Sequence, residues 1–228
     1  GSVSSVPLYK TEEMDPAEIR PVGIKASLIR TLHRRVVQAN KGALREYLEP
    51  CQVALMPAGG AVLSHTVRMM MEQRPDFAFC KLDSKNAFNS VHRDVVLKLV
   101  REKVPEIYNF VYQCYEENSY LFFGDDTLDS AEGVQQGDPL GPFLFSLAIM
   151  DIVKKMKSDF NVWYLDDGTI AGNTQTVLDD YREILKALES HGLAVNPSKC
   201  ELHLIRPQSE ECKGALELFR NITPGVIF

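Results

Sequence analysis

The sequence predicts an α+β fold in which antiparallel hairpins alternate with long helices. Short apolar stretches bounded by turn residues indicate the hairpins, and longer stretches with apolar residues at helical spacing indicate the helices. With 228 residues, the chain is long enough for one large domain or two small ones with a sizeable core. No stretch of it approaches the ~18 unbroken apolar residues that a membrane helix needs.

The first half of the chain is expected to begin with a hairpin and to continue mainly as helices. The expected strands are residues 6–10, 18–24 and 77–82, and the expected helices begin at residue 27 and cover residues 61–72 and 90–103. Ser27 is a suitable N-cap, and Leu28 and Leu32 share one face of the helix that follows. Gly59-Gly60 interrupts the helical pattern before the second helix.

The second half is expected to contain two hairpins and two amphipathic or apolar helices. The expected strands are residues 119–123, 127–134, 162–165, 168–171 and 201–205, and the expected helices are residues 139–157 and 176–191. The first of these helices opens at a bend rich in glycine and proline. Gly192 is placed as the C-cap that ends the second helix.

Charge is distributed unevenly along the chain. The net charge of -6 argues by itself against a nucleic-acid partner. Residues 20–45, however, contain seven basic residues and no acidic one, so the rest of the chain holds 18 basic and 31 acidic residues. A basic run on a helix is often a solvated face, but the motifs described below favour a role facing phosphates.

The cysteines argue against a zinc site and against a disulfide framework. They are odd in number, widely spaced and never arranged as Cys-x-x-Cys. The five are Cys51, Cys80, Cys114, Cys200 and Cys212. The N-terminus also has no charged-then-apolar secretory pattern. We therefore expect reduced thiols in an intracellular protein, with the choice between nucleus and cytoplasm left open.

Three carboxylates stand at the ends of apolar strands. Asp83 follows the strand expected at residues 77–82, and Asp166-Asp167 lie between two further strands. Adjacent carboxylates at a tight turn repel each other, and bound cations relieve that repulsion. Two divalent ions about 3.5–4 Å apart stabilise the attacking and leaving oxygens of an in-line phosphoryl transfer, and Mg²⁺, with Mn²⁺ as the alternative, suits all-oxygen ligands. Asp-Asp-Gly is also ordinary hairpin chemistry, so these residues alone leave both interpretations open.

A series of motifs resembles those of reverse transcriptases, in particular the enzymes of non-LTR retrotransposons and group II introns. The motifs are VPLYK at residues 6–10, IRPVGI at 19–24, LDSKNAF at 82–88, GVQQGDPLGP at 133–142, YLDD at 164–167 and GLAVNPSKCEL at 192–202. Each motif is weak to moderate by itself, but six of them in the family's order, over nearly the whole chain, are far more specific. The resemblance implies the fingers and palm of a right-hand polymerase, with an antiparallel palm sheet packed on helices and the thumb absent.

The resemblance implies an RNA-directed DNA polymerase, a nucleotidyltransferase, and gives each matching residue a role. The implied catalytic and metal-binding residues are Asp83, Asp166 and Asp167, with Asp83 and Asp166 expected to meet and hold two ions and Asp167 in support. Lys199 is the implied proton donor to the pyrophosphate leaving group. The implied nucleotide-binding residues are Lys10 and Arg20 on the triphosphate, Phe88 as the side chain that excludes a 2′-hydroxyl, and Gln136 and Gly137 near the templating pair. The implied contacts to the template backbone are Arg30, Arg34 and Arg35 of the basic helix.

A second acidic turn, Asp125-Asp126, also fits the paired-acid pattern. In the palm of right-hand polymerases the paired acids follow the Gln-Gly segment, which here is at residues 136–137. Asp125-Asp126 precede that segment, whereas residues 166–167 follow it and have apolar strands on both sides. We therefore assign residues 125–126 to a turn and residues 166–167 to the site.

The resemblance also predicts how the chain is divided and what it binds. Residues 1–82 are expected to form the fingers region, with the first palm strand at 77–82, and residues 83–228 mainly the palm, with a fingers insertion around 104–135. The chain ends where a thumb would begin, so a thumb or an endonuclease is expected in a longer parent protein. The expected partners are an RNA template, a DNA or RNA primer and dNTPs, and no membrane.

Two other functions remain open from the sequence. An RNA-dependent RNA polymerase shares the palm, but Phe88 argues against it because such enzymes must accept the 2′-hydroxyl. A catalytically silent, domesticated reverse-transcriptase-like scaffold that binds RNA or protein fits the acidic net charge and the absent thumb. The presence of all three acids disfavours a scaffold, because holding unpaired carboxylates together is costly.

Overall fold

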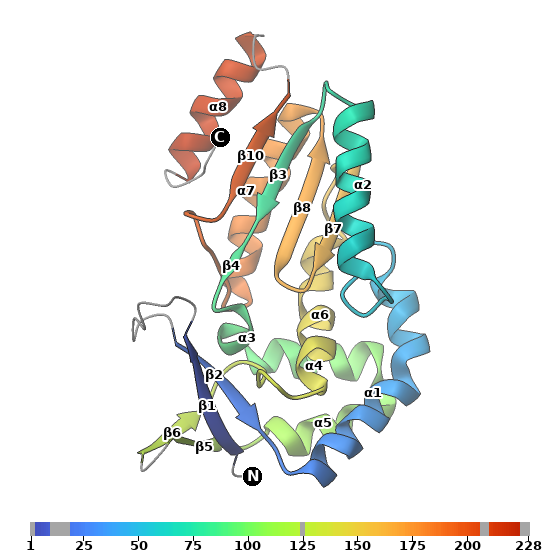
Figure 1. Cartoon of the computed structure of the whole chain (residues 1–228), viewed down its shortest axis with the longest axis vertical. Coiled ribbons are helices and arrows are strands. Elements are labelled where there is room, and N and C mark those ends of the chain that lie inside the picture. Colours follow the sequence, from blue (N-terminus) through green and yellow to red (C-terminus); the bar gives the residue numbers. More distant parts are fainter. Residues whose placement is uncertain (1–2, 10–18, 124–125, 206–209, 224–228) are drawn as a thin grey trace. The chain divides into compact units, whose positions relative to one another are not determined.

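The computed structural model describes residues 3–9, 19–123, 126–205 and 210–223 (Figure 1). The chain divides into two compact units. Unit 1 consists of Gly1–Tyr47 and Phe88–Ala148, and unit 2 consists of Leu48–Ala87 and Ile149–Phe228. The second point of division falls inside helix α6 (Leu140–Val153).

Unit 1 combines a four-stranded sheet with helices. Its strands are β1 (Val3–Tyr9), β2 (Ile19–Ile24), β5 (Ser119–Phe123) and β6 (Asp126–Ser130), in the order β2-β1-β5-β6. β1 runs parallel to β5, and the other neighbouring pairs are antiparallel. Its helices, some of which cross the unit boundary by one residue, are α1 (Ser27–Leu48), α3 (Ala87–Ser90), α4 (Arg93–Lys103), the 3-10 turn η2 (Pro105–Ile107) and α5 (Tyr108–Tyr115).

Helix α1 begins at Ser27, but its first apolar side chains do not face a core. Leu28 and Leu32 are 82% and 50% exposed. The buried side chains of the helix are His33, Leu44 and Leu48. Burial of a polar histidine instead of the neighbouring leucines requires polar partners for its ring, and these are described with the site below.

Unit 2 is built on an antiparallel four-stranded sheet. Its strands are β3 (Ala78–Leu82), β7 (Phe160–Tyr164), β8 (Asp167–Gly172) and β10 (Glu201–Leu204), in the order β10-β3-β8-β7. A short ribbon joins β4 (Ser84–Lys85) to β9 (Ala194–Val195). Its helices are α2 (Gly59–Gln73), α7 (Thr174–Ser190) and α8 (Glu210–Ile222).

The two faces of this sheet differ because successive side chains of a strand point to opposite sides. On one face Phe79, Phe160 and Ala171 form a buried cluster against apolar side chains of α2. On the opposite face Cys80 and Ile170 are buried, and α7 contacts β3 and β8. Figure 1 shows α7 behind the strands. The sheet is therefore sandwiched between helices, with its α2 face continuing beyond the apolar cluster.

The predicted helices are recovered, most of them with shifted ends, and three α-helices of the described residues were not predicted: the short α3, α5 and α8. Helix α6 is buried on all sides over most of its length, but it ends at Val153 rather than at residue 157. Gly192 follows α7 with a φ of 76°, which is the left-handed conformation expected of a C-terminal cap. Among the described residues, no helix combines the length and the apolar character that crossing a membrane demands.

Candidate active site

The acidic pair at residues 166–167 belongs to a tight hairpin between β7 and β8. Tyr164 and Asp167 are the last paired residues, so Leu165 and Asp166 form a two-residue loop. Leu165 has a φ of 56°, a conformation that residues with a Cβ rarely adopt. Gly168 pairs with Trp163, and a Cβ at position 168 would lie 2.7 Å from the indole ring. The glycine after the two acids is therefore required by packing and is not merely a turn residue.

Asp83 and Asp167 are brought to the same end of neighbouring strands. Leu82 of β3 pairs with Gly168 of β8 in an antiparallel register, so the next position on β3 meets the preceding position on β8. Asp83 is half-buried and Asp167 is exposed. Because side chains alternate, both acids share the α2 face with Lys81.

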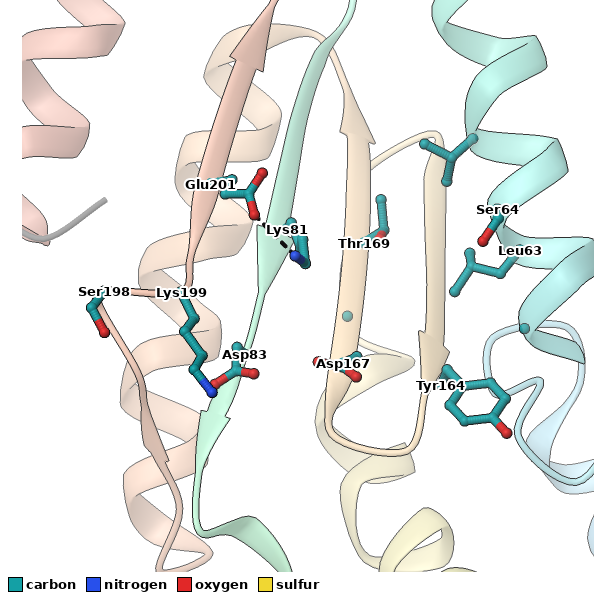
Figure 2. A pocket seen from close by; sticks show the side chains of 13 residues that line it. Leu63, Ser64, Lys81, Asp83, Tyr164, Asp167, Thr169, Ser198, Lys199 and Glu201 are labelled. Carbon is teal, nitrogen blue, oxygen red and sulfur yellow. Dashed lines mark hydrogen bonds and ion pairs between the residues drawn. The ribbon is translucent and has the colours of Figure 1, made fainter. Parts of the chain in front are cut away.

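A cavity of about 590 Å³ opens on this face, and Figure 2 shows the side chains around it. Asp83, Asp167 and Lys199, three of the residues singled out from the sequence, line the cavity. The other lining residues are Gly60, Leu63, Ser64, Val67, Lys81, Tyr164, Gly168, Thr169, Ser198 and Glu201. Residues more than 80 positions apart in the chain thus meet at one place in unit 2.

The loop that carries Lys199 is tied to the backbone of Asp83. The N–H of Asn196 donates a hydrogen bond of 2.8 Å to the Asp83 carbonyl oxygen, and the Cys200 thiol donates to the same oxygen at 3.9 Å. Ser84, the next residue in the chain, pairs with Val195. In Figure 2 the Lys199 side chain extends toward Asp83. An ammonium group is therefore held beside the carboxylates by the same backbone that positions them.

A cross-strand ion pair, which was not expected from the sequence, lies beside the acids. The Lys81 ammonium donates to a Glu201 carboxylate oxygen at 2.9 Å. This hydrogen bond raises the pKa of Lys81, burial opposes the rise, and the negative charges of Glu201, Asp167 and Asp83 add to it. Lys81 stands two residues before Asp83, so the alternation of the strand already placed it on the acidic face and was a signal that could have been used.

The described residues fit a divalent cation whose coordination is completed by substrate. No group of three His, Cys, Asp or Glu side chains in the described parts of the chain is arranged to hold a metal ion without further ligands. Asp166 lies in the hairpin loop and is not among the cavity-lining residues. Mg²⁺ in phosphoryl-transfer sites is commonly held by one or two carboxylates plus water and substrate phosphates. Asp83 and Asp167 supply two such carboxylates to one cavity.

The other residues singled out from the sequence lie in unit 1 or outside the described residues. Phe88 is half-buried and stacks on Phe145 with ring centroids 4.7 Å apart. The carbonyl oxygen of Gln136 accepts a hydrogen bond of 2.9 Å from Gly23 N–H. Gly137 has a φ of 86°, and a Cβ there would lie 2.7 Å from the Gly23 carbonyl oxygen. The Gln-Gly segment is therefore held closely against the end of β2.

Of the basic residues expected to contact phosphates, all but Lys10 lie on described elements of unit 1. Lys10 lies outside the described residues, as does Asp125. The backbone of Arg20 is part of β2, where it pairs with Leu8. Arg34 and Arg35 are exposed on α1, and Arg30 is half-buried. Two of the three arginines expected to contact template backbone are thus accessible on the surface of unit 1.

Unit 1 contains a cluster of charged residues around the buried Asp138 that the sequence pattern did not indicate. The Lys25 ammonium donates to one carboxylate oxygen of Asp138, and His33 Nδ1 lies 2.6 Å from the other. Burial would lower the pKa of His33, but hydrogen bonds to Asp138 and Cys114 and the Asp138 charge raise it to about 9. Burial would raise the pKa of Asp138, but His33 and Lys25 lower it. Asp138 Oδ1 also accepts from Leu140 N–H at 3.0 Å, so an acid just before the start of α6 was the available signal.

Comparison with solved structures confirms the expected fold. The chain superposes on apo telomerase from Candida tropicalis with a TM-score of 0.64 at 13% identity, over 89% of this chain and 44% of that one. It superposes on telomerase from Candida albicans in complex with a telomeric RNA fragment with a TM-score of 0.60 at 15% identity, over 91% of this chain and 42% of that one. The α+β arrangement is that of a right-hand polymerase.

Sequence comparison identifies the family to which the chain belongs. The Pol polyprotein of a type-1 retrotransposable element R2 from Nasonia vitripennis is 27% identical over 234 residues, which cover 93% of this chain and 23% of that protein. A retrotransposable element SLACS protein from Trypanosoma brucei gambiense is 26% identical over 60% of this chain and 13% of its own length. The chain therefore spans about a quarter or less of these relatives. A family model described as reverse transcriptase (RNA-dependent DNA polymerase) matches residues 9–214, and the chain belongs to the reverse transcriptase family.

Proposed function

We propose that the chain carries the polymerisation site of an RNA-directed DNA polymerase, which transfers a nucleotide from a dNTP to a primer 3′-hydroxyl on an RNA template. The observation that supports this most strongly is the meeting of Asp83 and Asp167 at one cavity, beside Lys199. Family membership over residues 9–214 supports the same reaction. A cavity of about 590 Å³ lies within the range of ligand pockets of ~300–1,000 Å³.

The proposed cofactor is Mg²⁺, with Mn²⁺ as the alternative. The sequence interpretation assigned two ions to Asp83 and Asp166, with Asp167 in support. Because Asp167 and not Asp166 lines the cavity with Asp83, Asp83 and Asp167 would hold the ions, and Asp166 would support them from the hairpin loop. When bound, two such ions lower the pKa of an attacking hydroxyl and neutralise charge on the transferred phosphoryl group. The two carboxylates on one cavity, together with the preference of Mg²⁺ for carboxylate and phosphate oxygens, support this choice.

The chain's own residues would position the nucleotide and move one proton. Lys199 would protonate the departing pyrophosphate, because its ammonium group extends toward the acids from a loop that is fixed to the Asp83 backbone. Lys10 and Arg20 would contact the β- and γ-phosphates as charge-assisted donors. Phe88 would exclude the 2′-hydroxyl, and the segment of Gln136 and Gly137 would contact the templating pair.

The template would be bound through its phosphates. Arg34 and Arg35 are exposed on α1, and arginine is suited to bidentate contact with phosphate oxygens. Arg30 would complete this basic stripe. Such contacts give affinity that depends on salt and not on base sequence. The retrotransposon relatives are far longer than this chain, so a thumb or an endonuclease elsewhere in the polypeptide is part of the proposal.

The test compares Asp83→Asn and Asp167→Asn with Asp151→Asn in primer extension on an RNA template with dNTPs. Asp151 is an exposed acid that pairs with Lys155 on the surface, so its variant is a matched control. The first two variants should lose roughly 10³-fold or more of the extension rate, since a bound metal ion contributes several kcal/mol to such reactions. Asp151→Asn should extend at the wild-type rate.

A binding measurement separates the polymerase from a catalytically silent scaffold. Mg²⁺ or Mn²⁺ should raise the unfolding midpoint of the wild-type chain, because a ligand that binds the folded state stabilises it. The two site variants should lose this shift, and Asp151→Asn should keep it. No metal-dependent shift and no extension by the wild-type protein would contradict the proposal and favour the scaffold. Extension with NTPs in preference to dNTPs would favour an RNA polymerase.

A further inference from the structure

The side chain of Gln52 forms two hydrogen bonds with the backbone of Leu165 in the hairpin loop that carries the acids. Leu165 N–H donates to Gln52 Oε1 at 2.9 Å, and Gln52 Nε2 donates to the Leu165 carbonyl oxygen at 3.2 Å. Gln52 is 1% exposed, so water does not compete for these bonds. A glutamine more than 100 positions away in the chain thus makes both hydrogen bonds that a neighbouring strand would make to Leu165.

The backbone around Gln52 brings its side chain to this position. Trp163 N–H donates to the Cys51 carbonyl oxygen at 2.6 Å, and Val53 N–H donates to the Trp163 carbonyl oxygen at 2.9 Å. Gln52 therefore forms an isolated parallel β-bridge with Trp163, near the C-terminal end of β7. The backbone pairing stops at Trp163, and the Gln52 side chain extends it to Leu165, two residues further along the chain.

The residue that Gln52 holds is the one in an unfavourable conformation. Leu165 has a φ of 56°, and its Cβ disfavours this region of the backbone map. Such a residue keeps its conformation when its surroundings fix it. The acids at positions 166 and 167 follow immediately, so the dihedral angles of Leu165 set the direction in which both carboxylates leave the strand.

The orientation of the Gln52 amide is determined by its partners. Oε1 accepts from Ala54 N–H at 3.2 Å as well as from Leu165 N–H, so the oxygen must face two donors and the nitrogen must face the carbonyl. Glutamate at this position would accept both N–H groups but, when ionised, would offer no proton to the Leu165 carbonyl. Methionine has a similar length and would make neither bond.

We propose that Gln52 is a positioning residue for polymerisation, which holds the loop at Leu165 so that Asp167, two residues further on, lines the cavity. It would not touch the substrate itself. This inference rests on the proposed polymerase function. It predicts that loss of the Gln52 hydrogen bonds impairs the rate of nucleotide transfer in molecules that are fully folded.

The experiment measures single-nucleotide extension on a primed RNA template for wild type, Gln52→Met and a control, Asp180→Asn. Asp180 is also buried, and it accepts hydrogen bonds from the backbone at Lys157 and Ser158, beyond the opposite end of β7. Asp180→Asn should therefore destabilise unit 2 without touching the hairpin loop. The readouts are the melting temperature, the fraction of active molecules from the burst amplitude, kcat per active molecule, and KM for dNTP.

We expect Gln52→Met to lower kcat per active molecule at least tenfold and to raise the metal concentration needed for half-maximal rate. Asp180→Asn should lower the melting temperature by a similar amount but keep kcat per active molecule within twofold. Gln52→Met with an unchanged kcat per active molecule and only a lower melting temperature would overturn the inference.

A pH profile of Gln52→Glu gives a second, independent readout. Protonated glutamic acid regains the donor that ionised glutamate lacks, and burial raises the pKa of such a carboxyl group. The rate of Gln52→Glu relative to wild type should therefore rise as the pH is lowered, and a flat ratio would count against the role of the hydrogen bond. If wild type itself does not extend primers, the proposed function fails. If wild type extends, Asp83→Asn does not and Gln52→Met is unimpaired, only this inference fails.

Discussion

The two units place aspartate side chains in opposite environments. In unit 1 the Asp138 side chain is 1% exposed and meets Lys25 and His33, and Leu140 N–H adds a further donor. In unit 2 Asp83 and Asp167 line an open cavity. A buried carboxylate surrounded by its own donors contributes to the fold, whereas carboxylates that line a cavity can take a ligand. The same type of side chain therefore stabilises the fold in unit 1 and, as proposed, binds metal ions for catalysis in unit 2.

The largest expected difference between the two kinds of aspartate is in the free energy of unfolding of their Asn variants. Asp138→Asn removes a charge on which half-buried Lys25 and buried His33 depend, and breaking a buried ion pair typically costs about 3–5 kcal/mol. Asp83→Asn removes one of two neighbouring like charges, so it should leave the free energy of unfolding nearly unchanged. Chemical denaturation of both variants measures this contrast. A similar loss of stability in both would erase the distinction between the two kinds of aspartate.

The pH dependence of unit 1 should follow from the same cluster. The pKa of His33 is raised to about 9 from 6.5, so the folded state binds this proton more tightly than the unfolded state. Its stabilisation is complete below about pH 6.5 and is lost as the pH rises through about 9, an effect of roughly 3 kcal/mol at most. The pKa of Asp138 is lowered, so its stabilisation is present above its ordinary pKa and is lost in acid.

Denaturation at a series of pH values tests this, with His33→Asn as the comparison. Asparagine keeps a donor for Asp138 but does not titrate, so the loss of stability at alkaline pH should disappear in the variant. The loss in acid should remain. An alkaline decline that persists unchanged in His33→Asn would assign it to another group.

The smallest expected effect concerns the exposed side of the helix that carries His33. Arg34→Gln and Arg35→Gln should each weaken RNA binding evenly across template sequences, because phosphate contacts carry no sequence information. Each should also reduce the slope of log affinity against log salt by about 1. Arg182→Gln, at an exposed arginine paired with Asp179 on α7, is the control, and an equal change there would indicate a general charge effect.

The sequence predicted those features of the site that depend on local patterns, such as acids at the ends of apolar strands, and on the order of the motifs along the chain. Asp83 follows an apolar strand, and residues 166–167 stand between two strands, so the pattern alone indicated that these acids end strands. The meeting of Asp83 with Asp167 follows from the β3–β8 register. The preference for residues 166–167 over Asp125-Asp126 stays a prediction, because Asp125 lies outside the described residues.

What the sequence did not predict depends on contacts between distant positions. Lys25 and Asp138 are 113 positions apart, as are Gln52 and Leu165, and no periodicity links residues at such separations. Gln52 lies in a stretch between α1 and α2 without a regular pattern. The exposed Leu28 and Leu32 show the same limit, because an apolar face on a helix predicts burial only when another element covers it.

The pairing of β3 with β8 has a consequence for how this protein tolerates insertions and deletions. Removing or adding one residue between Phe77 and Asp83 would shift every later position of that strand to the other side of the sheet. The Asp83 carboxylate would then point into the apolar layer beneath α7, although no functional residue had been replaced. Surface loops generally tolerate insertions and deletions, but the spacing within this strand is as fixed as the identity of the acid that ends it.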